Sequence, residues 1–213
     1  MPEPSIPVFV FAAEGQRVGP DTPHLTYADA YAVETALDLA VAYPPHETPV
    51  RLIGLFISAQ NRAYAVWSES VASGRVFSKA EFFLAEPTPE ETPKPAKETP
   101  LPTPVPSLEE RMSALLSGFY PGMIDGVFAE TGELAVAAAD ALAALGRDDI
   151  EVFSASTSGN TESLLSPLLV ACVGLNAGEA GGLCYSAASA LLSGEPVQSF
   201  VALPQTFAYS PNP

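Results

Sequence analysis

The sequence predicts an α/β fold: three layers, with a mostly parallel sheet covered by helices on both faces. Three observations lead to this class. Apolar, β-rich runs alternate with helical segments, the run from Leu52 to Ile57 is interrupted by nothing polar, and glycines stop the later helices at Gly146 and Gly194. A strand without polar alternation is buried on both faces, which is typical of parallel sheets. Strands that alternate with helices build such a sheet through right-handed crossovers.

The first half of the chain contains two predicted helices between three predicted strands. The first helix opens at Thr26, with Asp29 as a capping-box-like partner, and carries apolar residues at helical spacing as far as Val41. The segment YPPHETP then breaks this helix. The predicted elements are a strand over 6–12, a helix over 26–41, a strand over 50–58, a helix over 61–72 and a strand over 78–85.

The second half has a more regular rhythm. Ser107 caps a helix with Glu110 as its capping-box partner, and an Ala-rich helix from about Glu133 stops at Gly146. A further helix ends at Gly194. The predicted elements are helices over 107–119, 133–145 and 178–193, strands over 123–129, 149–154 and 168–174, and an extended tail over 198–209.

Residues 86–107, EPTPEETPKPAKETPLPTPVPS, form the clearest break in composition. Prolines combined with Glu, Lys and Thr supply neither a core nor a hydrogen-bonded ladder, so we expect an extended, solvated spacer with polyproline character. The segment separates a predicted strand from the next helix. We interpret it as an insertion or loop within a single domain that spans residues 1–213.

The charge balance excludes several classes of partner. The chain has 9 Lys+Arg against 25 Asp+Glu, a net charge of −16, and Arg147 is its last cationic residue. No basic cluster can replace phosphate counterions or dock on an anionic membrane, so we expect no nucleic-acid partner. We also find no apolar run of membrane-spanning length and no visible signal peptide, and expect no membrane insertion.

Catalytic signatures are missing from the sequence as well. The chain has 2 His and 2 Cys, and it contains no HExxH, P-loop, GxGxxG or GxSxG pattern. Cys172 and Cys184 are too few for a disulfide framework or a zinc site. We therefore expect a protein that is not an enzyme and that uses no metal and no cofactor.

The segment IDGVFAETGELAVAAADALAALGRDDIEVFSAS (residues 124–156) resembles the second lobe of type I periplasmic sugar-binding proteins, the ribose/galactose-binding family. Residues 168–197 resemble the strand, the Gly-opened helix and the closing segment that follow in that lobe. The run IPVFVF resembles the strand that precedes the passage from first lobe to second. The resemblance covers about residues 6–205. It implies a single periplasmic-binding-protein-like lobe of a bacterial ABC transporter component, located in the periplasm or at the cell surface.

The chain also departs from the family pattern. The family's Asn-Asp pair corresponds to Thr131 and Gly132 here, and a family carboxylate at the end of the next strand corresponds to Ala155. Such carboxylates accept hydrogen bonds from sugar hydroxyls, which Gly and Ala cannot do. We expect the family's first lobe to be absent from this chain or separately encoded, so that the chain offers half of a two-lobed site.

The predicted sheet brings the carboxyl ends of its strands to one edge, where open α/β sheets bind ligands. Polar side chains that follow the strands are candidates for contacts with a sugar or a similar small polar ligand. The resemblance places Arg62 near a sugar-contacting arginine, and Glu130 beside the lost Asn. A stacking role for Trp67 or Tyr31 is the weaker interpretation, because a lone Trp at helical spacing more often packs in a core. The candidate ligand-binding residues are Ser58, Gln60, Asn61, Arg62, Glu130, Thr131, Ser156 and Asn176.

Two functions from different classes stay open. The first is a non-catalytic module that binds a small polar ligand in transport or sensing. The second is a degenerate lobe that acts as an interaction or dimerisation scaffold, with a homodimer or a separate first lobe as partner; it predicts an exposed apolar face near Phe11, Leu25 and Trp67. A repressor effector domain of the same superfamily is less favoured, because such domains usually carry a Pro-x-Asp lead-in where this chain has residues 147–149, Arg-Asp-Asp.

Overall fold

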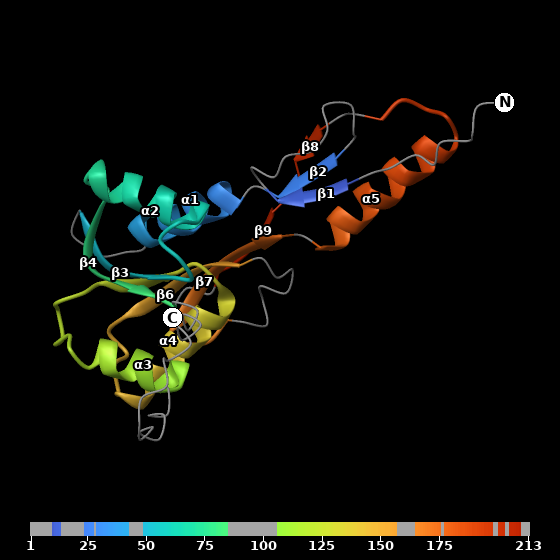
Figure 1. Cartoon of the computed structure of the whole chain (residues 1–213). Coiled ribbons are helices and arrows are strands. Elements are labelled where there is room, and N and C mark those ends of the chain that lie inside the picture. The colour runs from blue at the N-terminus through green and yellow to red at the C-terminus, as the bar shows by residue number, and fades with distance from the viewer. Residues whose placement is uncertain are drawn as a thin grey trace, which may run out of the picture.

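The described strands form two sheets (Figure 1). The computed structural model describes residues 10–13, 24–27, 29–42, 49–84, 106–156, 165–175, 177–197, 200–202 and 205–209. The strands are β1 (Val10–Ala13), β2 (His24–Tyr27), β3 (Val50–Phe56), β4 (Val76–Phe83), β5 (Gly126–Ala129), β6 (Glu151–Ser156), β7 (Leu169–Leu175), β8 (Phe200–Ala202) and β9 (Gln205–Tyr209).

The larger sheet has the order β4-β3-β5-β6-β7-β9. Its first five strands are parallel, and β9 pairs with β7 in the antiparallel direction. The smaller sheet has the order β1-β2-β8 and is parallel throughout. The predicted α/β class with a mostly parallel sheet is confirmed. The smaller sheet is an addition that the sequence did not predict, and the organisation of residues 1–213 as a single lobe stays a prediction.

Helices cover both faces of the larger sheet (Figure 1). On one face lie α1 (Asp29–Ala42) and α2 (Arg62–Ala72), and on the other α3 (Leu108–Leu116) and α4 (Gly132–Ala144). The fifth helix, α5 (Ala177–Leu192), extends away from these layers toward the end of the molecule that carries the smaller sheet (Figure 1). The two hydrophobic cores therefore sit above and below the larger sheet.

Several elements differ from the sequence prediction. The predicted helix start at Thr26 is wrong, because Thr26 lies in β2 and the helix begins at Asp29. The predicted extended tail contains β8 and β9, which join different sheets. In both cases the strand pairs with a segment distant in sequence: β2 and β8 pair in the smaller sheet, and β9 pairs with β7 in the larger one, and such pairing leaves no local sequence signal. Residues 6–9 and the insertion as far as residue 105 lie outside the described residues.

Strand β3 supplies residues to both hydrophobic cores. Leu52 and Phe56 belong to the core with α1 and α2, whereas Ile53 and Leu55 belong to the core with α3 and α4. All four side chains are fully buried. This explains the apolar run in the sequence, because a central parallel strand has no solvent face on which a polar residue could lie.

Gly54 of β3 makes room for the only tryptophan of the chain. A Cβ atom at Gly54 would lie 2.5 Å from Cε2 of Phe56 and 2.9 Å from Cε2 of Trp67. Trp67, from α2, is fully buried and stacks on Phe128 with ring centroids 5.6 Å apart. Its indole N–H donates a hydrogen bond of 3.0 Å to Glu81 of β4. The glycine therefore fixes how closely α2 approaches the sheet.

We predict that Gly54→Ala destabilises the fold by about 1–3 kcal/mol, because the added methyl group forces the Trp67 ring out of its place. The control is Gly182→Ala in α5, where nothing lies within 4 Å of the added Cβ atom and removing a helical glycine stabilises by about 0.5–1 kcal/mol. Urea denaturation monitored by tryptophan fluorescence measures both changes. Equal stability of Gly54→Ala and the parent chain would contradict this packing.

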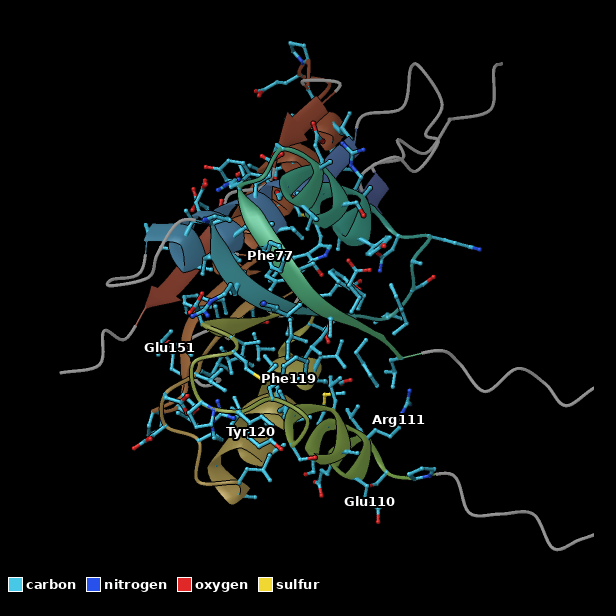
Figure 2. All side chains as sticks on the ribbon, turned by 90° about the vertical axis from the view of Figure 1, so that its left-hand side faces the viewer. Phe77, Glu110, Arg111, Phe119, Tyr120 and Glu151 are labelled. Atoms are coloured by element: carbon cyan, nitrogen blue, oxygen red, sulfur yellow. The ribbon has the colours of Figure 1, made fainter. Side chains whose placement is uncertain are left out.

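The described residues on either side of the Pro-rich insertion make contacts with the sheet and with each other. The Leu84 N–H donates to the Phe56 carbonyl at 2.7 Å, which continues the end of β4. Figure 2 shows Arg111 on α3, where its guanidinium lies 4.6 Å from the ring centre of Phe82 and donates to the Phe83 carbonyl. The predicted Ser107–Glu110 capping box is confirmed and sets the start of α3.

We predict that replacing residues 87–104 by a short Gly/Ser linker leaves the thermal midpoint within a few degrees of the parent value. The contacts at both ends persist, and the entropy of loop closure changes only slowly with loop length.

By contrast, Arg111→Ala in the full chain should lower stability by about 1 kcal/mol, because a cation–π contact and a hydrogen bond are lost. Differential scanning calorimetry compares the three chains, and loss of cooperative unfolding in the shortened chain would contradict the prediction.

Candidate functional site

Strands β3 and β5 end side by side at the carboxyl edge of the larger sheet. They pair in parallel, with Leu55 opposite Ala129. The backbone N–H of Glu130, just beyond β5, donates to the Leu55 carbonyl at 2.9 Å and extends the ladder by one bond. The loop after β3, residues 57–61, therefore begins directly beside the loop after β5.

The carboxylate of Glu130 ties these two loops together. One oxygen, Oε2, accepts from the backbone N–H of Ile57 at 2.8 Å. The other, Oε1, accepts from the side-chain amide of Asn61 at 2.6 Å. Hydrogen bonds to a charged acceptor are stronger than those between neutral groups, so this half-buried carboxylate fixes the start and the end of the β3–α2 loop.

Asn61 also fixes the beginning of α2. It is the N-cap residue, and its Oδ1 accepts from the backbone N–H of Tyr64 at 2.9 Å. Because Oδ1 serves the cap, the amide nitrogen faces the Glu130 carboxylate, and both ends of the Asn61 side chain are used. Within the loop, the N–H of Gln60 donates to the Ser58 hydroxyl oxygen at 3.1 Å. The loop thus has a defined conformation at the sheet edge.

The remaining predicted residues differ in where they lie. Arg62 and Gln60 are exposed and Ser58 is half-buried, all on or next to the β3–α2 loop. Thr131 is the N-cap of α4, where its hydroxyl oxygen accepts from the N–H of Leu134 at 3.3 Å. Ser156 is the last residue of β6, and its side chain is not among those described. Asn176 lies outside the described residues.

The structure brings together residues from the loops after β3 and β5. Asn61 and Glu130 are in direct contact, and Thr131 follows Glu130 in the chain. A part of this arrangement that the sequence did not reveal is the backbone amide of Ile57. The predicted strand ran to residue 58, whereas β3 ends at Phe56. A shorter strand frees the Ile57 amide from the ladder, and no pattern in the sequence marks that end.

The aromatic residues considered for sugar stacking are placed differently. Trp67 is fully buried in the core. The expectation of an exposed apolar face at Trp67 is therefore wrong, because Gly54 opens a place for the indole against the sheet. Tyr31 of α1 is 59% exposed. The side chains of Phe11 and Leu25 are not among those described.

Two cavities among the described residues lie between helices. One of about 500 Å³ is lined by residues of α3 and α4, including Leu108, Glu133 and Val136, and it reaches Gly132, the residue that follows Thr131. Another of about 280 Å³ lies between α1 and α2 and contains the ion pair of Asp38 and Arg75. Within the described part of the chain, no three His, Cys, Asp or Glu side chains gather as a metal site. None of the described helices is long and apolar enough to cross a membrane.

Comparison with known proteins finds likeness in structure only. Neither a family model nor a curated protein matches the sequence. Solved structures match along most of the chain. A sugar ABC transporter from Yersinia enterocolitica aligns with a TM-score of 0.64 and 14% identity over 96% of this chain and 58% of its own. A 5-methylthioribose transporter solute binding protein from Thermotoga lettingae aligns with a TM-score of 0.60 and 16% identity, over 96% of this chain and 61% of its own.

A transcriptional regulator is similar to the same degree. The LacI family regulator from Arthrobacter sp. FB24, solved in complex with lactose, aligns with a TM-score of 0.62 and 20% identity over 96% of this chain and 70% of its own. This chain thus spans 58% of the Yersinia protein and 61% of the Thermotoga protein. These neighbours are a sugar ABC transporter, a transporter solute binding protein and a transcriptional regulator. The chain has the type I periplasmic-binding-protein-like fold that sugar transporter proteins and LacI-family regulators share.

Proposed function

We propose that this chain is a non-catalytic solute-binding module that holds a sugar or a similar small polar ligand at the carboxyl edge of its larger sheet. The observation that carries the proposal is the β3–α2 loop, whose conformation is fixed by hydrogen bonds to Glu130 and Asn61. A fixed polar edge loses little conformational entropy when a ligand binds. Structural neighbours with the same fold include a protein solved with 5-methylthioribose and one solved with lactose.

The chemistry of the edge suits a ligand rich in hydroxyl groups. Arg62 supplies a charged, planar donor, Gln60 supplies a donor and an acceptor, and Ser58 supplies a hydroxyl. Thr131, Ser156 and Asn176 complete the candidate set on neighbouring loops.

The chain spans only part of the length of its structural neighbours. We therefore propose that a partner closes over this edge, either a separately encoded first lobe or a second copy of this chain. A role in transport would place the module outside the cytoplasm, and a role in sensing fits the regulator neighbours equally well.

A second candidate is an interaction or dimerisation scaffold without a small-molecule ligand. Helix α5 favours it, because Tyr185 is 76% exposed and Leu192 is 80% exposed. Only Ala180 is buried among the residues of α5 whose exposure is described. Large apolar side chains on an exposed helix are typical of a surface that another chain covers. The two candidates differ in the binding partner. The ligand-binding module binds a solute, whereas the scaffold binds another protein chain.

We predict that a panel of monosaccharides, amino acids and nucleosides contains one class that raises the thermal midpoint of the chain saturably, because a ligand that binds only the folded state stabilises it. Arg62→Ala should weaken this ligand about tenfold or more, since a charge-assisted hydrogen bond is lost. The matched control is Arg75→Ala, which removes the same charge just after the far end of α2 and should leave the affinity within about twofold.

The absence of any shift across the panel, together with a concentration-dependent dimer in light scattering, would overturn the ligand proposal and support the scaffold. Equal loss of affinity in Arg62→Ala and Arg75→Ala would show that the ligand responds to the overall charge of the chain. In that case the ligand binds somewhere other than the β3–α2 loop.

A further inference from the structure

We propose that Glu130 is a positioning residue: its carboxylate sets the conformation of the β3–α2 loop and thereby the place from which Arg62 meets a ligand. This inference rests on the proposed function. It assigns Glu130 the role of holding the loop in place rather than the role of contacting the ligand. The sequence places Glu130 beside a lost Asn of the family pattern and among the candidate ligand contacts. The hydrogen bonds of its two oxygens point instead to a role within the protein.

The Glu130 carboxylate faces a donor at each end of the loop. Oε2 accepts from the Ile57 amide at 2.8 Å, and Oε1 accepts from the Asn61 amide group at 2.6 Å. One side chain therefore defines both ends. The backbone of Glu130 is itself fixed, because its N–H donates to Leu55 at 2.9 Å. The carboxylate is thus held by the sheet and in turn holds the loop.

Asn61 connects the carboxylate to α2. It accepts from Tyr64 through Oδ1 and donates to Glu130 through its amide nitrogen. The first turn of α2 is therefore coupled to the end of β5 through a single side chain. Arg62 is the next residue after Asn61 and the first residue of α2. Any shift of Asn61 moves the backbone that carries Arg62.

Position 130 requires a carboxylate rather than an amide. Two donors face this side chain, and a carboxylate accepts from both. A glutamine has one oxygen and one NH₂ group, so Glu130→Gln places a donor against the Ile57 N–H or the Asn61 NH₂. Asn61→Asp places two carboxylates against each other. The double variant restores the pattern, because the carboxylate now at position 61 accepts from the amide now at position 130. The carboxylate also still caps α2, since Asp is an equally good N-cap.

This exchange of amide and carboxylate gives a direct test. The four chains are the parent, Glu130→Gln, Asn61→Asp and the double variant, with Glu133→Gln as the control for loss of a nearby exposed carboxylate. For each we would measure hydrogen exchange of the Ile57 amide by NMR. We would also measure the affinity for the panel compound that stabilises the parent chain. The double variant carries the same net charge as the parent, so a global charge effect cannot explain its behaviour.

We expect each single variant to speed exchange of the Ile57 amide about tenfold or more and to weaken the ligand by a similar factor, since a hydrogen bond to a charged group is replaced by repulsion. The double variant should recover both quantities to within about threefold of the parent, and Glu133→Gln should change neither.

Unchanged Ile57 exchange in both single variants, or unchanged affinity alongside faster exchange, would overturn the proposal. So would a double variant no better than the single ones. If the parent binds no compound of the panel, the proposed function fails, whereas the Ile57 exchange still decides whether Glu130 fixes the loop.

Discussion

The rest of the structure depends on the pairing of β3 with β5, which a carboxylate fixes at each end. At the amino end, Asp125 accepts from the backbone N–H of Arg51 at 2.7 Å and forms an ion pair with the Arg51 guanidinium. At the carboxyl end, Glu130 accepts from the N–H of Ile57. Between these points both strands are buried on two faces, so hydrogen bonds and side-chain packing select one register. The helices on each face then cover a sheet whose centre is already defined.

This constraint explains how a polar edge can be ordered in a chain with a net charge of −16. An unpaired carboxylate beside the backbone ends of parallel strands would favour solvent and leave the loop free. Here Glu130 accepts hydrogen bonds from two donors. One of them, Asn61, also caps the first turn of α2 and so links that helix to the edge. A similar pairing lies at the opposite edge, where hydrogen bonds from Arg147 hold the pKa of Asp149 below its usual range. The β3–α2 loop is thus held by hydrogen bonds to Glu130, which directly follows the buried strand β5.

Local patterns predicted the parts of the fold whose causes are local. The capping box of Ser107 and Glu110 is confirmed. Gly146 and Gly194 adopt positive φ angles of 67° and 76° just after helices end, as the stop signals required. The failures involve distant partners: Thr26 lies in a strand because β1 and β8 pair on either side of it. The types of the edge residues were predictable, but the contact of Asn61 with Glu130 joins positions 69 residues apart, and only the folded chain shows it.

The central claim is that the edge built on β3 and β5 is where this chain meets a small polar ligand. An NMR titration of the parent chain with the panel of monosaccharides, amino acids and nucleosides tests it most directly, because backbone amides report where a ligand binds. We predict saturable chemical-shift changes at residues 57–62 and at Glu130 and Thr131. Changes confined to the cavity between α3 and α4, or no changes with any compound of the panel, would contradict this claim.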